Sequence, residues 1–260
     1  MSPDPNRGLI LDCDGVLADT ELNGHLVAFN QAFAELGHDI HWTKEEYKVL
    51  LRVGGGKERL MTYLTQHREI DIAKGRDLTK AVDALHRRKS EIYVHLVEAG
   101  QLPGRPGIRR LVTEALDAGW KVGVASTSAV KSVEAVLRAV VGEETSGRLS
   151  GVFAGDIVFE KKPAPDIYDF ALRELGRGPE EVVVVEDSES GALAAARAGL
   201  SHIVTVSYFT AEDDFAGATV VVDNLGEPDS PAAVRSGAQI LNAAGYIDVS
   251  SLEHILEGAD

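Results

Sequence analysis

The chain has 260 residues, and its 26 basic and 41 acidic side chains give a formal net charge of −15. Hydrophobic residues make up 44% of the chain and charged residues 26%, which is typical of a globular protein and argues against disorder. All apolar runs are shorter than the ~18–20 residues that a membrane-spanning helix needs. Because phosphate backbones are held by clustered Lys and Arg, the acidity also argues against nucleic-acid binding. A small phosphorylated ligand is not excluded, since its binding depends on local charge.

The cysteine content and the start of the chain indicate a reducing compartment. Cys13 is the single cysteine, so the chain has no intramolecular disulfide framework. The first seven residues, MSPDPNR, lack the basic and apolar regions of a secretory signal and the Arg- and Ser-rich pattern of a transit peptide. We expect a cytoplasmic protein, or one of the plastid stroma if a leader has been removed.

Short apolar runs alternate with helical patterns along most of the chain. The runs indicate buried strands of a parallel sheet, because they are apolar throughout rather than at every second residue. In chain order, the predicted strands cover residues 8–12, 121–126, 151–154, 182–186, 202–206 and 219–222. The predicted helices between them cover residues 108–118, 130–140, 166–175 and 191–198. This alternation predicts an α/β fold with a doubly wound parallel-sheet (Rossmann-like) core, whose chemistry lies at the carboxyl ends of the strands.

The segment from about residue 22 to 97 breaks this alternation. It has no pattern typical of a strand, and a stretch rich in Gly and Pro follows it. Its apolar residues recur at helical spacing, as at Leu26, Phe29, Phe33 and Leu36. We therefore predict a helical cap domain over residues 21–103. It is inserted after the first strand of a core domain that comprises residues 1–20 and 104–260.

Acidic residues lie at the ends of two predicted strands. Asp12 and Asp14 belong to the first strand end, and Glu186 and Asp187 to the end of the fourth. If both strands are central, the four carboxylates converge on one sheet edge, where they repel one another unless protons or a bound cation compensate. Oxygen ligands favour a hard ion, so we expect Mg²⁺ rather than Zn²⁺. One carboxylate can also act as a nucleophile and another as acid and base. The structural alternative is an acidic turn or a helix cap.

Two further motifs follow strands. Ser126, Thr127 and Ser128 lie at the end of the second predicted strand and offer hydroxyl and backbone donors to phosphate oxygens; alternatively, they cap the next helix. Lys162, in the Lys-Lys-Pro sequence that begins at Lys161, can place a fixed positive charge beside a phosphoryl group. Alternatively, the two lysines form a solvated pair in a loop before a helix. Each motif is weak alone, and the order of all four along the chain is the informative feature.

The ordered series Asp-x-Asp, Ser, Lys-Pro and Glu-Asp resembles the haloacid dehalogenase superfamily of phosphotransferases, specifically its members with a helical cap after the first strand. The resemblance covers roughly residues 8–225. It implies that Asp12 is a nucleophile that forms an aspartyl-phosphate, and that Asp14 protonates the leaving group and then activates water. It further implies that Ser126 and Lys162 hold the transferring phosphoryl group. The implied ligands of Mg²⁺ are Asp12, the backbone carbonyl of Asp14, Asp187, and Glu186 directly or through water.

Just before and within the predicted cap, several positions resemble the CbbY-type xylulose-1,5-bisphosphate phosphatases, which remove the C1 phosphate from a by-product of Rubisco. The matching positions are Asp19-Thr20-Glu21, His25, Phe29-Asn30, Glu46-Tyr47 and Gly-Gly-Lys-Glu-Arg at 55–59. The resemblance assigns to substrate binding Glu21, His25, Tyr47, Gly55, Gly56, Lys57, Glu58, Arg59, Thr127 and Ser128. Of these, Glu21, Tyr47, Lys57 and Arg59 are expected on the sugar and its distal phosphate. The glycine run at 54–56 frees backbone N–H groups for an anion, although a plain turn before a helix is the alternative. For Glu21 and His25 the alternative is a solvated helix surface.

The predicted activity is Mg²⁺-dependent hydrolysis of the C1 phosphate of xylulose 1,5-bisphosphate, which gives xylulose 5-phosphate. We expect a monomer without nucleic-acid or membrane partners. The alternative is a β-phosphoglucomutase-like enzyme or another sugar monophosphate phosphatase of the superfamily. Such mutases carry a His four residues after the hinge threonine, where this chain has Gly24, and a Lys after Ser-x-Ser, where it has Ala129. Both departures disfavour a mutase. A non-catalytic sugar-phosphate sensor is disfavoured because Asp12 and Asp14 are both present.

Overall fold

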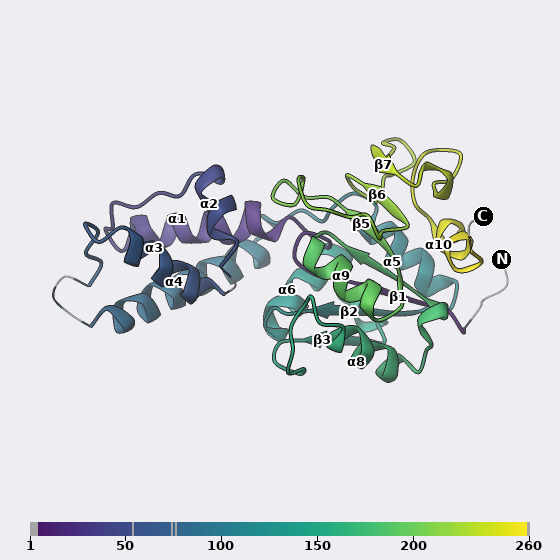
Figure 1. Ribbon diagram of the computed structural model, residues 1–260, viewed down its shortest axis with the longest axis horizontal. Coiled ribbons are helices and arrows are strands. Elements are labelled where there is room, and N and C mark those ends of the chain that lie inside the picture. Colours follow the sequence, from purple (N-terminus) through teal and green to yellow (C-terminus); the bar gives the residue numbers. More distant parts are fainter. Residues whose placement is uncertain (1–4, 54, 74, 76, 259–260) are drawn as a thin grey trace. The chain divides into compact units, whose positions relative to one another are not determined.

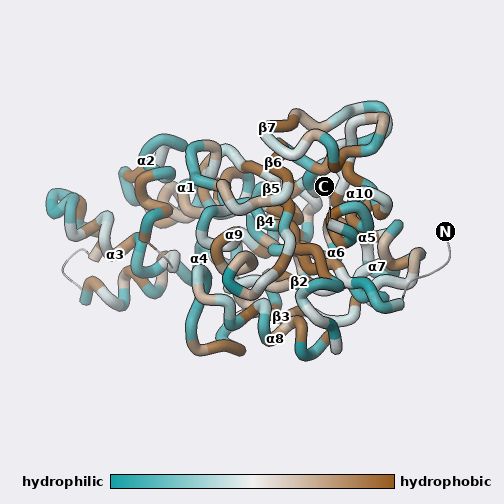
Figure 2. The backbone as a smooth tube through the Cα atoms, turned by 45° about the vertical axis from the view of Figure 1, so that its right-hand side comes forward, coloured by the Kyte–Doolittle hydropathy of each residue, from teal (hydrophilic) through white to brown (hydrophobic). Residues whose placement is uncertain are grey.

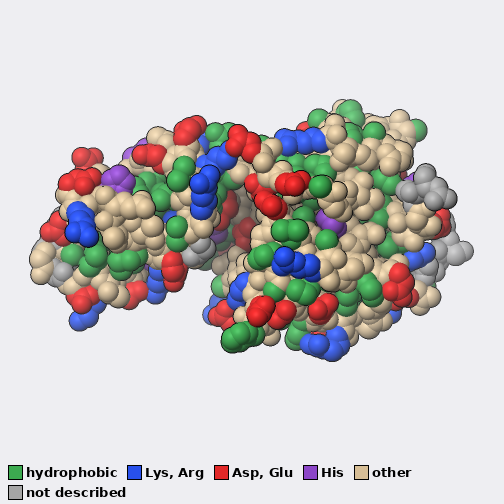
Figure 3. Space-filling view, in the orientation of Figure 1, with side chains coloured by type: hydrophobic (Ala, Val, Ile, Leu, Met, Phe, Trp, Pro, Cys, Tyr) green, Lys and Arg blue, Asp and Glu red, His purple; other side chains and the backbone are tan. Residues whose placement is uncertain are grey.

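The computed structural model describes residues 5–53, 55–73, 75 and 77–258. It divides into two compact units, which we call the core unit (Met1–Asp19 and Pro103–Asp260) and the cap unit (Thr20–Leu102). The core unit holds the strands and the cap unit is helical (Figure 1). Acidic and basic side chains are interspersed on the face drawn in Figure 3. Among the helices of the described residues, none is both long and apolar enough to cross a membrane.

The described residues of the core unit form one seven-stranded sheet with the order β3-β2-β1-β4-β5-β6-β7. Its strands are β1 (Gly8–Leu11), β2 (Lys121–Ser126), β3 (Gly151–Ala154), β4 (Val182–Glu186), β5 (Ser201–Thr205), β6 (Val220–Val222) and β7 (Val234–Ser236). Neighbouring strands from β3 to β6 pair in parallel, and β7 pairs antiparallel with β6. Leu11 of β1 lies opposite both Val124 of β2 and Val185 of β4. The predicted doubly wound fold is confirmed, and the carboxyl ends of β1 and β4 lie side by side.

Helices cover both faces of this sheet (Figure 1). The core-unit helices are α5 (Ile108–Asp117), α6 (Val130–Val141), α7 (Glu143–Gly147), α8 (Asp166–Leu175), α9 (Glu189–Arg197) and α10 (Val249–Leu256), with short 3₁₀ turns η2 (Pro179–Glu181) and η3 (Ala238–Ile240). On one face, Tyr168 of α8 and Ala194 of α9 pack with Ile10 and Val184 in a buried cluster. The buried strands of the sheet carry hydrophobic residues, which are brown in Figure 2. Complete burial of one Val or Ile side chain stabilises the fold by roughly 1.5–3 kcal/mol. The packed sheet therefore holds the residues at its edge in fixed positions.

The cap unit packs its helices around aromatic side chains. Its elements are the π-helical turn η1 (Glu21–His25) and the helices α1 (Leu26–Glu35), α2 (Lys44–Leu50), α3 (Gly56–Gln66) and α4 (Leu78–Glu98). The rings of Phe29 and Phe33 lie 4.8 Å and 5.0 Å from that of Trp42, measured between centroids. Asn30 fixes this packing, because its side chain donates to the carbonyl of Trp42 and accepts from its N–H. The predicted apolar stripe ends one residue early: α1 stops at Glu35, and the Leu36 side chain is exposed.

The tail after the sixth strand forms elements that no sequence pattern predicted. β7 is three residues long and exposed, and α10 packs against β4 and α5. Arg110 of α5 holds the tail, since its Nη2 donates to the carbonyls of Gly226 and Ile247 at 2.8 Å and 2.9 Å. The guanidinium also lies 4.4 Å from the centroid of the Tyr246 ring. The tail is therefore part of the core unit.

Candidate active site

Three carboxylates meet where β1 and β4 end. Asp12 follows β1, and its N–H donates to the carbonyl of Val185 at 2.9 Å, which extends the parallel pairing by one residue. Glu186 is the last residue of β4, and Asp187 follows it. All three side chains are buried, and one carboxylate oxygen of each lies within 4.8 Å of the others. The parallel register thus brings Asp12, Glu186 and Asp187 together.

The ammonium of Lys162 lies between two of these carboxylates. Its Nζ is 2.6 Å from Asp12 Oδ1, 2.6 Å from Glu186 Oε1 and 3.2 Å from the carbonyl oxygen of Ala125. Burial lowers the pKa of Lys162, but the carboxylates of Asp12 and Glu186 outweigh it and hold that pKa well above its usual value. Lys162 therefore stays charged and compensates part of the negative charge at the sheet edge.

The remaining negative charge shows in the pKa values of the carboxyl groups. Burial raises the pKa of Asp12 to about 7; Lys162 opposes the rise, while Glu186 and Asp14 add to it. Burial, together with Asp12 and Glu186, also raises the pKa of Asp187 well above its usual value. A buried set of oxygen ligands with excess negative charge is the kind of site that binds a hard cation. Asp12, Glu186 and Asp187 fit such an ion.

Two glycines leave room for the acidic side chains. Gly15 has a φ of +82°, and a β-carbon on it would lie 2.0 Å from Asp187 Oδ2. A β-carbon on Gly191, in the first turn of α9, would lie 2.0 Å from Glu186 Oε2. The N-cap of α9 is Ser188, whose side chain accepts the N–H of Gly191 at 3.1 Å. Glu186 and Asp187 therefore do not serve as the cap of that helix.

The Ser-Thr-Ser motif lies at the end of β2. Ser126 is buried, and its Oγ accepts the N–H of Ser128 at 3.1 Å, which leaves its own hydroxyl proton for a further acceptor. The hydroxyl of Ser128 donates a short hydrogen bond to Asp14 Oδ2, and Thr127 is exposed. The N-cap of α6 is Ala129, without a side-chain hydrogen bond. The motif therefore does not cap α6, and Ser128 orients the carboxylate of Asp14.

Arg105, which sequence reasoning did not single out, braces the loop after β1. Its Nη1 donates to the carbonyl of Gly15 at 2.8 Å and to Asp19 Oδ1 at 3.2 Å. Its Nη2 donates to the carbonyl of Val206 at 2.9 Å and, through a short hydrogen bond, to that of Asp223. The guanidinium thereby ties the Asp-x-Asp loop to the segments that follow β5 and β6. The available signal was a charged residue inside a Pro-Gly-Arg-Pro-Gly turn.

In the cap unit, Glu21, Tyr47 and Arg59 form one hydrogen-bonded group. The hydroxyl of Tyr47 donates to Glu21 Oε2 at 2.6 Å, and Arg59 Nη1 donates to the Tyr47 oxygen at 2.7 Å. Arg59 Nε also donates to the carbonyl of Leu50 at 3.2 Å. Tyr47 and Arg59 are buried and Glu21 is half-buried. Three of the residues assigned to substrate binding by resemblance thus lie together, with the guanidinium of Arg59 near the carboxylate of Glu21.

His25 lies in a second group with Lys89 and Tyr93. Lys89 Nζ is 2.8 Å from His25 Nδ1, and the imidazole stacks on Tyr93 with the centroids 4.1 Å apart. Burial, followed by the charges of Lys89, Arg59 and His86, holds the pKa of His25 well below its usual value. His25 is therefore a neutral imidazole that accepts a hydrogen bond from Lys89. The side chain of Lys89, in α4, is itself buried.

The position of His25 has a structural explanation. It ends η1, a π-helical turn in which the N–H of Leu26 donates to the carbonyl of Glu21. A π-turn takes up one residue more than an α-turn. A histidine five residues after Thr20 can therefore occupy the place that a four-residue spacing gives in an α-helix. The presence of Gly24 before His25 thus carries no weight against a mutase, whereas the argument from Ala129 is unaffected.

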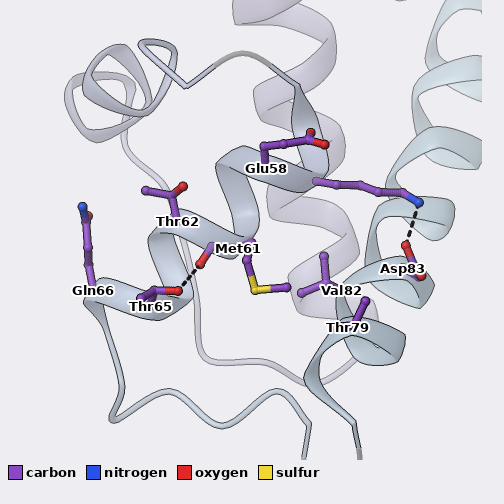
Figure 4. A pocket seen from close by; sticks show the side chains of 9 residues that line it. Glu58, Met61, Thr62, Thr65, Gln66, Thr79, Val82 and Asp83 are labelled. Carbon is purple, nitrogen blue, oxygen red and sulfur yellow. Dashed lines mark hydrogen bonds and ion pairs between the residues drawn. The ribbon is translucent and has the colours of Figure 1, made fainter.

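Lys57 and Glu58 line a pocket of about 530 Å³ between α3 and α4 of the cap unit (Figure 4). Lys57 Nζ lies 2.6 Å from Asp83 Oδ1, and both side chains are about half exposed. Met61 of α3 and Val82 of α4 also line this pocket and are its apolar members. The structure therefore pairs Lys57 with Asp83, whereas it pairs Arg59 with Tyr47.

The glycine run precedes α3. Gly55 is the N-cap of this helix and has a φ of +86°. A β-carbon on Gly56 would lie 2.7 Å from Nε2 of His86, so the glycine allows a close approach of α4. Gly54, the first residue of the predicted run, lies outside the described residues. Gly55 and Gly56 thus stand at the start of α3, and Gly56 also allows a close contact between the two helices.

Comparison with known proteins agrees with this arrangement. Residues 7–199 match the model of the family described as haloacid dehalogenase-like hydrolase. A CBBY-like protein of Arabidopsis thaliana is 42% identical over 225 residues, which cover 85% of this chain and 69% of that protein. Protein CbbY of Cereibacter sphaeroides is 43% identical over 221 residues, which cover 85% of this chain and 93% of that protein.

Solved structures give the same result. The crystal structure of a CbbY mutant from Rhodobacter sphaeroides, in complex with xylulose-(1,5)bisphosphate, has a TM-score of 0.73 and 42% sequence identity to this chain. The match covers 84% of this chain and 94% of that one. With a family match over residues 7–199 and relatives of this similarity, the chain belongs to the haloacid dehalogenase-like hydrolases.

Proposed function

We propose that this protein is a Mg²⁺-dependent phosphatase that removes the C1 phosphate of xylulose 1,5-bisphosphate and releases xylulose 5-phosphate. The observation that carries the phosphatase assignment is the ammonium of Lys162 between Asp12 and Glu186, at the ends of two adjacent parallel strands. The choice of sugar is supported by the similarity to a CbbY protein whose crystal structure holds xylulose-(1,5)bisphosphate. A β-phosphoglucomutase-like activity has less support, because Ala129 stands where such mutases carry a lysine.

Asp12 is the proposed nucleophile. A carboxylate oxygen attacks phosphorus, the bond to the C1 oxygen of the sugar breaks, and an aspartyl-phosphate forms. Two anions must approach each other in this step. Lys162, which is 2.6 Å from Asp12 Oδ1, offsets that repulsion and holds the carboxylate in place. Ser126 offers a hydroxyl proton to an oxygen of the phosphoryl group.

Asp14 is the proposed acid and base. In the first step its carboxyl proton goes to the departing sugar oxygen, and in the second step its carboxylate takes a proton from the water that attacks the aspartyl-phosphate. The second step releases inorganic phosphate and restores Asp12. The hydrogen bond from Ser128 to Asp14 Oδ2 fixes the carboxyl group for both transfers.

Mg²⁺ would be held by Asp12, Glu186 and Asp187 with the backbone carbonyl of Asp14. When bound, it supplies positive charge to the oxygens of the transferring phosphoryl group. The fit rests on three buried carboxylate oxygens within 4.8 Å of one another. Gly15 and Gly191 keep the carboxylates of Asp187 and Glu186 at this position, because neither glycine has a β-carbon to displace them.

The cap unit is proposed to bind the rest of the substrate. Arg59 is the proposed partner of the distal phosphate, and Glu21 and Tyr47 are the proposed partners of sugar hydroxyls. Lys57 reaches a phosphate only if it leaves Asp83. Exposed ion pairs of this kind contribute about 0–1 kcal/mol, so a doubly charged phosphate can displace Asp83. The remaining residues proposed for substrate binding are His25, Gly55, Gly56, Glu58, Thr127 and Ser128.

The test is a panel of sugar mono- and bisphosphates incubated with the purified protein. We expect release of inorganic phosphate, fastest with xylulose 1,5-bisphosphate. Chelation should stop the release and added Mg²⁺ should restore it. Asp12→Asn should abolish turnover, and retained activity would remove the proposed nucleophile. An isomerised sugar phosphate without free phosphate would establish the mutase instead.

A further inference from the structure

The hydroxyl of Tyr168 and the ammonium of Lys162 share one oxygen of Glu186. Tyr168 comes from α8, six residues after Lys162 in the chain, and its side chain is fully buried. Its hydroxyl donates a short hydrogen bond to Glu186 Oε1, the atom that also lies 2.6 Å from Lys162 Nζ. The ammonium of Lys162 lies 5.1 Å from the centroid of the Tyr168 ring. Tyr168 therefore contacts both Glu186 and Lys162, and Lys162 in turn contacts Asp12.

We propose that Tyr168 is a positioning residue of the active site, which fixes the carboxylate of Glu186 and through it the ammonium of Lys162 against Asp12. Tyr168 would then belong to the active site of the proposed phosphatase. Only the kinetic measurement of the test below rests on that proposed function. No motif in the sequence marked Tyr168, because its partner lies 18 residues away on another element.

The position of Glu186 is held from several sides. Oε1 accepts hydrogen bonds from the hydroxyl of Tyr168 and the ammonium of Lys162, and Oε2 accepts one from the N–H of Asp187 at 3.2 Å. The backbone of Gly191 closes the remaining side, since even one added β-carbon would lie 2.0 Å from the carboxylate. Without the phenol, Oε1 keeps only the lysine as a donor in a buried site. The carboxylate can then rotate with Lys162 and draw it away from Asp12.

Hydrogen bonds from residues behind a metal or reaction centre have measurable effects. Loss of such a partner typically costs about 10- to 100-fold in metal affinity or activity. Tyr168→Phe removes the hydroxyl and retains the ring, so the packing of α8 in its buried cluster and the contact of the ring with Lys162 are kept. The variant therefore separates positioning from packing.

The experiment compares wild type, Tyr168→Phe and the control Tyr246→Phe, whose ring lies under Arg110 in the tail. Turnover of a simple phosphate ester, p-nitrophenyl phosphate, measures kcat and KM, and electron paramagnetic resonance measures binding of Mn²⁺ in place of Mg²⁺. For Tyr168→Phe we expect kcat about 10- to 100-fold lower with KM within about 3-fold, and weaker Mn²⁺ binding. The control should match wild type in each measurement.

A double-mutant cycle with Glu186→Ala tests whether Tyr168 acts through Glu186. We expect Tyr168→Phe to change kcat less than about 2-fold in the Glu186→Ala background, because the acceptor of the hydrogen bond is gone. If the two single substitutions lower kcat by factors that multiply in the double mutant, the proposal is overturned. A Tyr168→Phe protein with wild-type kcat and wild-type Mn²⁺ affinity would also overturn it. If Glu186→Ala does not fold, as judged by circular dichroism, the Mn²⁺ titration of Tyr168→Phe decides. That titration needs no turnover, so its result is independent of the identity of the substrate.

Discussion

The carboxylate of Asp187 lies where a β-carbon on Gly15 would stand. The distance from that position to Oδ2 is 2.0 Å, and the φ of Gly15 is +82°. Two independent constraints therefore act on residue 15: a backbone conformation that side-chain-bearing residues rarely adopt, and the space that the carboxylate needs. The glycine of the Asp-x-Asp-Gly sequence links the end of β1 to the acid that follows β4.

We predict that Gly15→Ala lowers kcat at least ~100-fold, because Asp187 has to move by an ångström or more and displacements of that size cost about 10²-fold. Gly37→Ala is the matched control. Gly37 also has a positive φ, +68°, but nothing lies within 4 Å of the β-carbon position. The free energy of unfolding of Gly37→Ala should fall by about 1–2 kcal/mol, the cost of a positive φ for a residue with a β-carbon. Its kcat should be unchanged. Urea unfolding and phosphate release measure both quantities, and equal kcat values in the two variants would contradict the argument.

The adjacent lysines 161 and 162 provide a second matched pair. Lys161 Nζ donates to the carbonyl of Gly155 and to Asp156, which is fully exposed, whereas Lys162 lies between two buried carboxylates. We predict that Lys162→Met lowers kcat by at least ~10²–10³-fold, the loss seen on removing one donor to a reacting oxyanion. It should also lower the free energy of unfolding by about 3–5 kcal/mol, because a buried charge loses its partner.

Lys161→Met should cost at most about 1 kcal/mol, the upper range for an exposed pair, and should leave kcat within about 2-fold of wild type. Both variants are assayed with the same substrate and by denaturant unfolding. A Lys161→Met protein as impaired as Lys162→Met would show that the loop, and not the ammonium beside Asp12, is what the site requires.

The core motifs could be located from the sequence because each lies at the end of a strand. A parallel register carries Asp12 and Glu186 to the same edge once β1 and β4 are neighbours, and strand ends are visible as the point where an apolar run stops. The bounds of β2 and β4 match the prediction for the same reason. The short exposed strand β7 had no such signal.

The contacts that remained hidden join residues far apart in the chain. Arg105 reaches the carbonyl of Asp223 across 118 positions, and Lys89 reaches His25 across 64. Such contacts depend on how helices and loops pack against one another. The local sequence pattern of a turn or a helix face does not reveal which distant residue it contacts. The π-turn at 21–25 is a further example, because one extra residue in a helix leaves no mark in its apolar spacing.

A third prediction concerns the distal phosphate and rests on the proposed substrate. Lys57→Ala should raise KM for xylulose 1,5-bisphosphate by about 10-fold, the effect of losing one charge-assisted hydrogen bond of about 1.4 kcal/mol. KM for a monophosphate should change less than about 2-fold, since that substrate lacks the second anion.

Asp83→Ala is the complementary variant, because it frees the ammonium that now lies 2.6 Å from Asp83 Oδ1. It should leave kcat unchanged and lower KM for the bisphosphate by about 2- to 5-fold, as expected for loss of a competing pair of up to 1 kcal/mol. Steady-state kinetics with both substrates measures the split. Equal shifts for mono- and bisphosphate would place Lys57 away from the distal phosphate.

The last prediction concerns the pH dependence that His25 gives to the cap unit. Burial and the charges of Lys89, Arg59 and His86 hold the pKa of His25 well below its usual 6.5. The unfolded chain therefore binds a proton near pH 6.5 that the folded chain does not. Stability from the neutral imidazole is present above pH 6.5 and is lost as pH falls toward the lower folded pKa, at up to about 1.4 kcal/mol per pH unit.

His25→Gln keeps an acceptor for Lys89 and does not titrate. The difference in free energy of unfolding between wild type and this variant should be constant above about pH 7.5. Below pH 6.5 the wild type should lose stability relative to the variant. Comparing the two at each pH cancels the buried carboxyls Asp12 and Asp187, whose raised pKa values act in the opposite direction. Fluorescence of Trp42 in a Trp120→Phe background follows unfolding of the cap unit, because these are the two tryptophans of the chain. A difference that stays constant from pH 8 to 5.5 would show that His25 takes up its proton equally in both states, and the neutral imidazole assigned to the Lys89 contact would then be wrong.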